Sequence, residues 1–365
     1  MLETRCFRIL DANFNRAREA LRVMEEYARF VLDDAGLTAA IKEARHALTH
    51  EVEEMVARVQ AGGSVIAHRD IIGDVGREIA TRSEYERTDA AAVAVAAGKR
   101  LSEALRAIEE YGKVLDPTLA ATIEKIRYRG YELERRLTLA TQARQRFGQV
   151  RLYVVVTEEL CRGDWFETAR AALRGGADCL QLREKRLLDR ELLERAKRLN
   201  ALCREHEAMF IVNDRPDIAV ASGAHGVHLG QEDLPVAAVR RTVRASCIVG
   251  VSTHTIEQVC AAADQAPDYI AVGPMFESPT KPQTHIAGPA TLAAARAQTA
   301  LPLVAIGGIT AENATTVLAA APCCLCVCQA VIAQPDVTAA AHCLRDVMDR
   351  AGEAADGPSA KEKRT

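Results

Sequence analysis

The chain has 365 residues, a formal net charge of −3, and 48% hydrophobic and 27% charged residues. This composition is ordinary for a globular protein, and the length favours two domains over a single core. The near-neutral charge and the single Trp exclude the basic field and aromatic platform of a nucleic-acid-binding surface. The N-terminal segment lacks a signal-peptide pattern, and no apolar run is long enough for a membrane span. We therefore expect a cytoplasmic protein without nucleic-acid or membrane partners.

Residues 1–140 have the sequence pattern of an all-α domain with an internal duplication. Eight residues of segment 16–27 recur in the same order and spacing in segment 100–111, namely Arg16, Glu19, Ala20, Leu21, Arg22, Glu25, Glu26 and Tyr27. Each copy is followed by an acidic residue, Asp33 or Asp116, and by a second helical stretch. Two related helical hairpins predict a helical bundle. Apolar positions three or four residues apart mark the core face of the first helix, namely Phe14, Ala17, Leu21, Met24, Ala28 and Val31.

The segment between the two copies, residues 66–79, contains glycines and charged residues and is predicted to be a loop. One interpretation is a polar ligand pocket against the charged helix faces. The other is a solvated connector held by surface ion pairs. The side chains concerned are His68, Arg69, Asp70 and Asp74.

Residues 151–350 follow a different pattern, in which short β-rich runs alternate with helix-length segments. Eight such runs predict an α/β fold with a parallel sheet, and eight units in this length favour a TIM (β/α)₈ barrel. Residues 141–150 are polar and lack periodicity, so we interpret them as a linker. Residues 351–365 are predicted to be a disordered tail.

Cysteines cluster in the last strand-like run. Strand alternation places Cys324, Cys326 and Cys328 on one face and Cys323 on the other. We interpret the run as a buried strand that uses Cys as a small hydrophobic residue. The alternative is a metal or redox site, although no second cluster with ligand spacing accompanies it.

Polar side chains follow the second predicted strand, where a barrel interior would normally hold aliphatic residues. With a period of two, Gln181, Arg183 and Lys185 share one face. Two cations and an amide that point inward favour a polyanionic ligand. The alternative is an internal ion-pair network with Glu184 or other acidic neighbours.

Carboxylates follow the next two predicted strands. The third strand ends at Asn213 and Asp214, and Asp233 follows the fourth. In a TIM barrel the carboxyl ends of neighbouring strands meet at the same face, so Asp214 and Asp233 are expected to lie close together. Such a pair, completed by phosphate oxygens and water, is typical of Mg²⁺. The alternative for Asp233 is that it caps the following helix.

The remaining strand ends offer groups that bind phosphate. Ser252 ends the fifth strand and either contacts phosphate or caps the next helix. Ser278, Thr280 and Lys281 are expected in a loop over the barrel mouth. A glycine pair that includes Gly308 follows the seventh strand, where TIM barrels bind phosphate through backbone N–H groups and a helix N-terminus. These sites suit two phosphorylated substrates and a reaction driven by leaving-group stabilisation.

Six motifs in this half, in this order, resemble the thiamine-phosphate synthases. They are QLREK, FIVNDRPDIA, GVHLGQEDLP, VGVSTHT, DYIAVGPMFESPTKP and VAIGGI. The resemblance implies a transferase that joins a hydroxymethylpyrimidine diphosphate to a hydroxyethylthiazole phosphate. The products are thiamine phosphate and diphosphate, formed by a dissociative mechanism with Mg²⁺.

The resemblance also implies a role for each matched residue. Asp214 and Asp233 correspond to the magnesium ligands, and Asn213 to the partner of the pyrimidine ring. The thiazole phosphate is expected to bind to Ser278, Thr280 and Gly308. The pyrimidine diphosphate is expected to bind to Gln181, Arg183, Lys185, Asn213, Ser252 and Lys281.

The sequence departs from the family pattern in two places. A Ser at 278 replaces the usual Thr, and the eighth strand ends in Cys328 and Gln329 where a Ser is usual. A thiazole tautomerase-like isomerase is the alternative for the barrel, but it would not need the pyrimidine and magnesium residues. The helical half resembles an extension of some family members, and we consider it a non-catalytic oligomerisation or ligand-sensing module. The sequence leaves the oligomeric state open.

Overall fold

The computed structural model describes residues 2–58, 68–69, 86–277 and 285–356, in two compact units divided between Gln142 and Ala143. Among these residues no helix is both long enough and apolar enough to cross a membrane. The expected cytoplasmic location stays a prediction.

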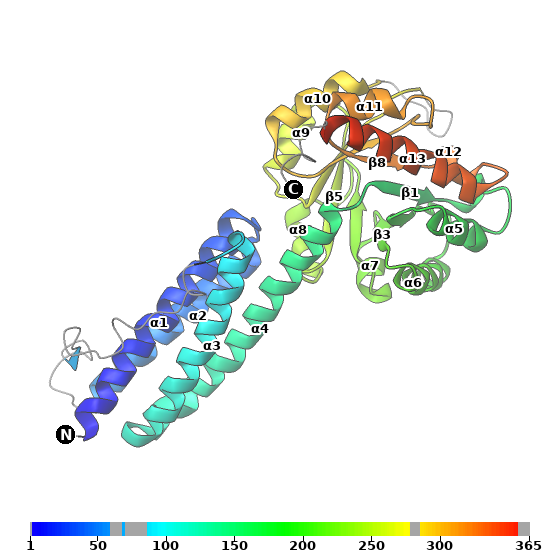
Figure 1. Cartoon of the computed structure of the whole chain (residues 1–365). Coiled ribbons are helices and arrows are strands. Elements are labelled where there is room, and N and C mark those ends of the chain that lie inside the picture. Colours follow the sequence, from blue (N-terminus) through cyan, green and yellow to red (C-terminus); the bar gives the residue numbers. More distant parts are fainter. Residues whose placement is uncertain (1, 59–67, 70–85, 278–284, 357–365) are drawn as a thin grey trace, which may run out of the picture. The chain divides into compact units, whose positions relative to one another are not determined.

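The first unit is a bundle of long helices (Figure 1), as the sequence analysis predicts. Its apolar stripe is buried as expected, except for Val31, which is 49% exposed because the first helix ends at Phe30. The four helices are α1 (Leu2–Phe30), α2 (Ala35–Arg58), α3 (Ala90–Leu115) and α4 (Pro117–Gly148).

The internal duplication is also visible in the buried ion pairs of this unit. Arg45 of α2 donates to buried Glu25 of α1 at 2.9 Å, and Arg127 of α4 donates to buried Glu109 of α3 at 2.6 Å. Equivalent helix positions therefore hold equivalent ion pairs. Such pairs fix the register of two helices, because a buried charge without its partner is costly.

The connector between the two copies lies mostly outside the described residues, including Asp70 and Asp74. Its described part contacts the first helix. Arg69 donates to both carboxylate oxygens of Asp11, at 2.7 and 2.8 Å, and His68 stacks on Phe7 with 4.9 Å between ring centroids. Arg69 is thus engaged in an ion pair, as the connector interpretation expects.

The second unit is a closed barrel of eight parallel strands in chain order (Figure 1), which confirms the predicted fold. The strands are β1 (Leu152–Val156), β2 (Cys179–Leu182), β3 (Met209–Asn213), β4 (Gly226–Leu229), β5 (Ile248–Thr253), β6 (Tyr269–Val272), β7 (Leu303–Ile306) and β8 (Cys324–Val327).

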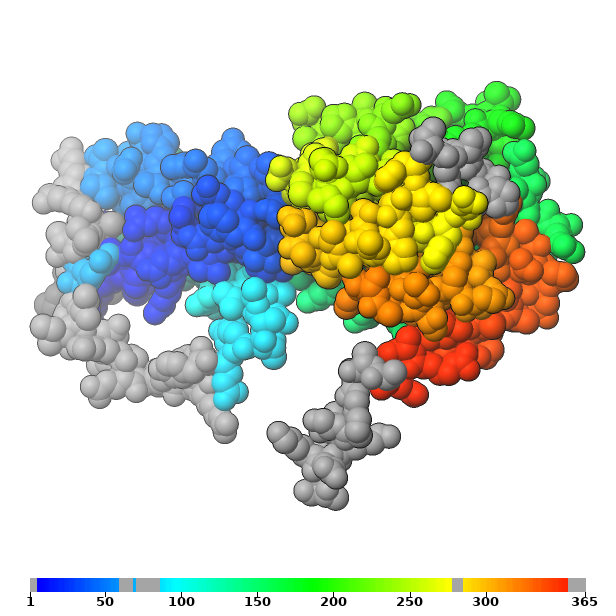
Figure 2. Space-filling view, turned by 90° about the horizontal axis from the view of Figure 1, so that it is seen from above, coloured from blue at the N-terminus to red at the C-terminus, as the bar shows by residue number. Residues whose placement is uncertain are grey.

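Helices cover the outside of the barrel, and α9, α10 and α11 lie side by side over it (Figures 1 and 2). A short 3₁₀ turn, η3 (Glu158–Leu160), follows β1. The helices are α5 (Trp165–Arg174), α6 (Asp189–Glu205), α7 (Pro216–Ser222), α8 (Val236–Thr242), α9 (Ile256–Ala263), α10 (Gly288–Gln298), α11 (Ala314–Ala320), α12 (Gln329–Ile332) and α13 (Val337–Asp356).

Strand alternation creates two cores, one on each side of the sheet. Leu152, Val154 and Val156 of β1 pack against the helices, whereas Tyr153 and Val155 point into the barrel. The inner core also contains Cys and Tyr side chains from other strands. The barrel interior is therefore filled, and the polar groups that could bind a ligand are restricted to its carboxyl-terminal end.

The segments predicted at the domain borders are partly helical. The expected linker, residues 141–150, contains the division between the two units but is helical through Gly148, because α4 continues with Thr141 and Phe147 buried and Ala143 partly buried. The expected disordered tail, residues 351–365, begins as the last turns of α13, which ends at Asp356. The final nine residues, 357–365, lie outside the described part of the chain.

Candidate active site

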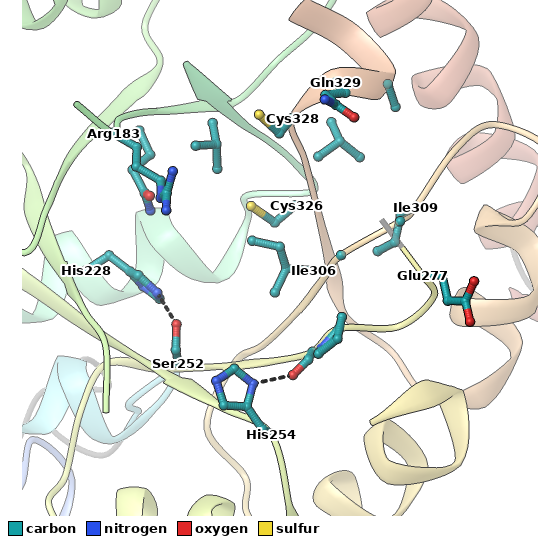
Figure 3. A pocket seen from close by; sticks show the side chains of 18 of the residues that line it. Arg183, His228, Ser252, His254, Glu277, Ile306, Ile309, Cys326, Cys328 and Gln329 are labelled. Atoms are coloured by element: carbon teal, nitrogen blue, oxygen red, sulfur yellow. Dashed lines mark hydrogen bonds between the residues drawn. The ribbon is translucent and has the colours of Figure 1, made fainter. Parts of the chain in front are cut away.

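A cavity of about 650 Å³ opens at the carboxyl ends of the strands. It brings together five residues that the sequence analysis proposes from four different strand ends, of which Figure 3 labels Arg183 and Ser252. The expectation that these distant segments converge is met for Gln181, Arg183, Asn213, Ser252 and Gly308.

Arg183 supplies positive charge to this cavity. The strand β2 ends at Leu182, and Arg183 follows it with a backbone bond to Val156 on β1. Within the described ranges Arg183 forms no ion pair. Glu184, the proposed partner in an internal network, instead accepts a hydrogen bond from the backbone N–H of Glu158. The guanidinium is therefore available for an anionic ligand.

Lys185 does not point inward with Gln181 and Arg183, as strict alternation predicts. Because β2 has already ended, Lys185 turns along the rim, where its side chain is 56% exposed. Its ammonium donates to Asp214 at 2.6 Å. Lys185 thus lies with the carboxylates that follow β3 and β4, and not inside the cavity with Gln181 and Arg183.

The carboxyl groups of Asp214 and Asp233 are close enough to shift each other's pKa, and so form the expected pair. Burial alone would raise the pKa of Asp214, but the ammonium of Lys185 and the carboxyl of Asp233 hold it below its ordinary value. Burial, together with the Asp214 carboxylate, raises the pKa of Asp233. Two carboxylates in contact repel each other unless a proton or cation lies between them, so this pair fits a hard divalent cation.

The alternative roles of helix capping are not observed. Asp233 accepts from the backbone N–H of Gly230 at 2.6 Å, and the cap position of α8 is Pro235. Ser252 hydrogen-bonds to His228 at 2.7 Å, whereas Thr255 caps α9. Neither Asp233 nor Ser252 therefore caps the helix that follows it.

The glycine pair after β7 forms a tight backbone turn on the opposite side of the cavity. Gly307 and Gly308 have φ angles of 100° and 67°. A Cβ on Gly308 would lie 2.7 Å from the carbonyl oxygen of Phe276. The turn differs from the expected helix N-terminus, because α11 begins only at Ala314 and Asn313 folds back to donate to the Gly308 carbonyl. A backbone turn of this kind exposes N–H groups to an anion.

The cysteines of β8 pack as a buried strand, as predicted. Cys324 and Cys326 lie in the inner core, Cys328 packs at its edge, and Cys323 packs against the outer core. Burial raises the pKa of Cys328 to about 12, so its thiol stays protonated at neutral pH. Among the described residues no Asp, Glu, His and Cys side chains form a group of three or more around a metal position.

The loop that is predicted to bind phosphate over the barrel mouth lies outside the described residues. It contains Ser278, Thr280 and Lys281, within residues 278–284. Their roles stay predictions.

The sequence analysis missed a set of polar side chains inside the barrel. Tyr153 and Tyr269 hydrogen-bond to each other, and His228 lies between Tyr269 and Ser252. Burial lowers the pKa of His228 to about 4, so the imidazole is neutral at pH 7. The sequence pattern could have indicated this set. Alternation along β1 and β4 places Tyr153 and His228 on the inner face, where a buried polar side chain must be hydrogen-bonded.

Comparison with known proteins identifies the two halves separately. A family model described as thiamine monophosphate synthase matches residues 152–331. A second model, described as the ThiD2 family, matches residues 8–136. The two matches correspond to the barrel and to the helical bundle.

Relatives of known family extend over nearly the whole chain. The thiamine-phosphate synthase of Synechocystis sp. is 40% identical over 333 residues, which cover 91% of this chain and 93% of the relative. That of Rhodopirellula baltica is 43% identical and covers 84% and 83%. The structure of thiamine phosphate pyrophosphorylase from Pyrococcus furiosus matches with a TM-score of 0.53 and 33% identity, over 57% of this chain and 98% of that one. The chain therefore belongs to the thiamine-phosphate synthase family of enzymes.

Proposed function

We propose that the barrel joins a pyrimidine diphosphate to a thiazole phosphate and releases diphosphate, using the site residues described above. The observation that carries this proposal is the arrangement of one cavity. Arg183, a cation without an ion pair among the described residues, and a backbone turn at Gly308 suited to phosphate line the same space. Two separate anion sites around one cavity suit two phosphorylated substrates that react with each other.

The pyrimidine diphosphate is assigned to the side formed by β2, β3 and β5. Gln181 is only 4% exposed and lies deeper than Arg183, so an uncharged ring fits beside its amide and beside Asn213. The charged diphosphate fits the rim, where Arg183, Lys185 and Ser252 lie. Lys281 completes this set by its resemblance to the family, although it lies outside the described residues.

Asp214 and Asp233 would hold Mg²⁺. The oxygen donors and the mutual contact of the two carboxylates fit this ion, and phosphate oxygens and water would complete its ligands. When bound, Mg²⁺ supplies Lewis-acid neutralisation of charge on the diphosphate. The Lys185 ammonium, which now contacts Asp214, is a local cation for the same charge.

The thiazole phosphate is assigned to the turn at Gly308, with Ser278 and Thr280 as its side-chain donors. Backbone N–H groups bind a phosphate without a counter-charge, which leaves Arg183 for the other substrate. The tautomerase-like alternative has no observation in its favour, because the residues assigned to the pyrimidine diphosphate would then have no role.

The described residues favour loss of the leaving group before attack. The Cys328 thiol is protonated, and the lowered pKa of His228, about 4, makes its imidazole a poor base for the Ser252 hydroxyl, so neither Cys328 nor Ser252 is activated as a nucleophile. Arg183 instead lies where it can stabilise negative charge that develops on departing diphosphate. The cavity holds the thiazole beside the pyrimidine, so that the resulting cation is captured by the thiazole rather than by water.

The test is formation of thiamine phosphate by the full chain with both substrates and varied Mg²⁺. Asp214→Asn should lower kcat/KM at least about tenfold and raise the Mg²⁺ concentration needed for half-maximal rate. Asp264→Asn, an exposed acid at the end of α9, is the matched control and should change neither quantity. No product at saturating substrates would reject the function, and an unchanged Mg²⁺ response would remove Asp214 from the metal site.

For residues 1–140, an oligomerisation or sensing role remains a hypothesis. The match to the ThiD2 family shows that this half has a family of its own, beside that of the barrel. Deleting residues 1–140 and comparing the oligomer size by light scattering tests the first role. An unchanged size would exclude it.

A further inference from the structure

A chain of hydrogen bonds crosses the inside of the barrel. The Gln181 amide nitrogen donates to the Tyr153 hydroxyl at 2.7 Å, and the hydroxyls of Tyr153 and Tyr269 are 3.2 Å apart. The Tyr269 hydroxyl lies 2.8 Å from Nδ1 of His228, and Nε2 of His228 lies 2.7 Å from the Ser252 hydroxyl. Five strands, β2, β1, β6, β4 and β5, each contribute one member.

The fold makes room for this chain. The Tyr269 ring stacks between Phe147 and His228, with centroid distances of 4.3 and 5.6 Å. It crosses directly over Gly250, where a Cβ would lie 1.9 Å from a Tyr269 ring carbon. Tyr153 and Tyr269 are 1% and 0% exposed, so their hydroxyls have no access to water as an alternative partner. The geometry of the chain is therefore fixed by packing.

Only the two ends of the chain, Gln181 and Ser252, are proposed to contact substrate. Figure 3 shows His228 joined to Ser252 at the cavity wall. A hydroxyl donates one hydrogen bond, and a neutral imidazole has one donor and one acceptor. Each member must therefore donate in the same direction as its neighbour. The whole chain has only two polarities, and the polarity at one end dictates that at the other.

Substrate binding selects one of these polarities. A diphosphate only accepts hydrogen bonds, so Ser252 must donate its hydrogen to it. Ser252 then accepts from Nε2–H of His228, whose Nδ1 accepts from Tyr269. Tyr269 in turn accepts from Tyr153. Tyr153 must then accept from the amide of Gln181, as observed, which leaves the Gln181 carbonyl oxygen free for the substrate.

We propose that this chain makes Gln181 a hydrogen-bond acceptor whenever a diphosphate is bound, and so selects a pyrimidine with an amino group over one with an oxo group. An amino group donates to the Gln181 oxygen, whereas an oxo group would face it without a hydrogen. Tyr153, Tyr269 and His228 are positioning residues for this selection. The inference rests on the proposed function, because it uses the assignment of Gln181 and Ser252 to the pyrimidine diphosphate.

The test measures dissociation constants of two ligands by calorimetry with the full chain and Mg²⁺. The ligands are the aminopyrimidine diphosphate and its 4-oxo analogue. The unaltered chain should prefer the amino compound at least about thirtyfold, since a mismatched buried polar group costs a few kcal/mol. Tyr269→Phe keeps the stacked ring but removes the central hydroxyl. It should reduce the preference at least about fivefold, because Gln181 and Ser252 are then no longer coupled.

Thr253→Val is the matched control. Thr253 is 1% exposed, and its hydroxyl donates to the Ala271 carbonyl, so the variant loses a buried hydrogen bond in the same sheet but outside the chain. Its preference should equal that of the unaltered chain. Trp165 fluorescence, which reports on the barrel, verifies folding of each variant.

A folded Tyr269→Phe that keeps the full preference would overturn the inference. If Tyr269→Phe does not fold, Tyr153→Phe gives the same measurement, because it frees the Gln181 amide to rotate. Failure of the unaltered chain to bind either ligand would instead reject the assignment of the pyrimidine site. Equal binding of both ligands by a chain that makes thiamine phosphate would reject only the selection.

Discussion

The two halves of the molecule treat charged side chains in opposite ways. In the helical bundle the buried carboxylates of Glu25 and Glu109 each meet an arginine from the next helix. At the barrel mouth, Asp214 meets the like charge of Asp233 as well as the Lys185 ammonium, and the Arg183 guanidinium has no ion pair among the described residues. Charges that are matched one to one inside the fold indicate structure, whereas a like-charge pair and a cation without a counter-charge indicate a ligand.

The largest expected effect concerns the buried ion pairs of the helical bundle. Glu109→Gln leaves the buried Arg127 guanidinium without its counter-charge and should cost about 3–5 kcal/mol in the stability of the helical bundle. The loss should appear in the helical signal on urea denaturation. The single Trp165 lies in the barrel, so its fluorescence transition should not move.

Glu132→Gln is the matched control, because Glu132 pairs with Arg135 on an exposed surface of the same bundle. It should give no measurable shift in either signal, since exposed ion pairs contribute little. A Glu109→Gln variant as stable as the unaltered chain would mean that the buried pair is not needed for the bundle. A parallel loss in Trp165 fluorescence would mean that the two halves unfold together.

The second prediction concerns the pH dependence of barrel stability. Burial lowers the pKa of His225 to about 4, and its Nδ1 accepts from the backbone N–H of Phe210 at 3.0 Å. Between about pH 6.5 and 4 the unfolded chain binds a proton here that the folded barrel does not. Stability should therefore fall as pH decreases through this window, by on the order of 2 kcal/mol for this residue.

His225→Gln should flatten the fall without removing it. His228, whose pKa burial also lowers to about 4, still titrates in the unfolded chain of the variant. The measurement is the Trp165 urea midpoint at pH 7.5, 6, 5 and 4.5 for both proteins. Identical slopes for the two would show that His225 takes up its proton equally in the folded and unfolded chains.

The third prediction concerns the backbone turn at Gly308, the proposed binding site of the thiazole phosphate. Gly308→Ala places a Cβ against the carbonyls of Phe276 and Glu277 and should displace the turn. The KM for thiazole phosphate should rise at least about tenfold, because backbone N–H bonds to an anion are worth roughly 1.5–3 kcal/mol each. The KM for the pyrimidine diphosphate should stay within about twofold.

Gly288→Ala separates strain from contact. Gly288 also has a positive φ of 72°, but a Cβ there would meet nothing within 4 Å. It should show the backbone cost in stability and leave both KM values unchanged. Equal effects of the two variants on the thiazole KM would remove Gly308 from the phosphate site.

The sequence predicted the barrel well because both signals behind it are local. Strand alternation and helix periodicity follow from side-chain direction, and they placed Gln181 and Asn213 correctly at the cavity. Lys185 was expected to point inward, but its orientation depends on where β2 ends, at Leu182, and this depends on pairing with neighbouring strands. The hydrogen-bond chain was missed for a similar reason, since Tyr153 and Tyr269 come from strands far apart in sequence.

The smallest expected effect concerns Cys328, at the end of β8 where the family usually has Ser. Cys328 lines the same cavity as Gly308, and its thiol is a weak donor (Figure 3). Cys328→Ser should lower the KM for thiazole phosphate by about two- to fivefold, because a hydroxyl bonds phosphate better than a thiol does. Cys326 also lines the cavity but is only 2% exposed, so Cys326→Ser should give no such gain and should instead cost about 1–3 kcal/mol in stability, since its hydroxyl is buried. A Cys328→Ser variant with an unchanged or higher KM would show that the end of β8 does not contact the phosphate, and that the cradle alone binds it.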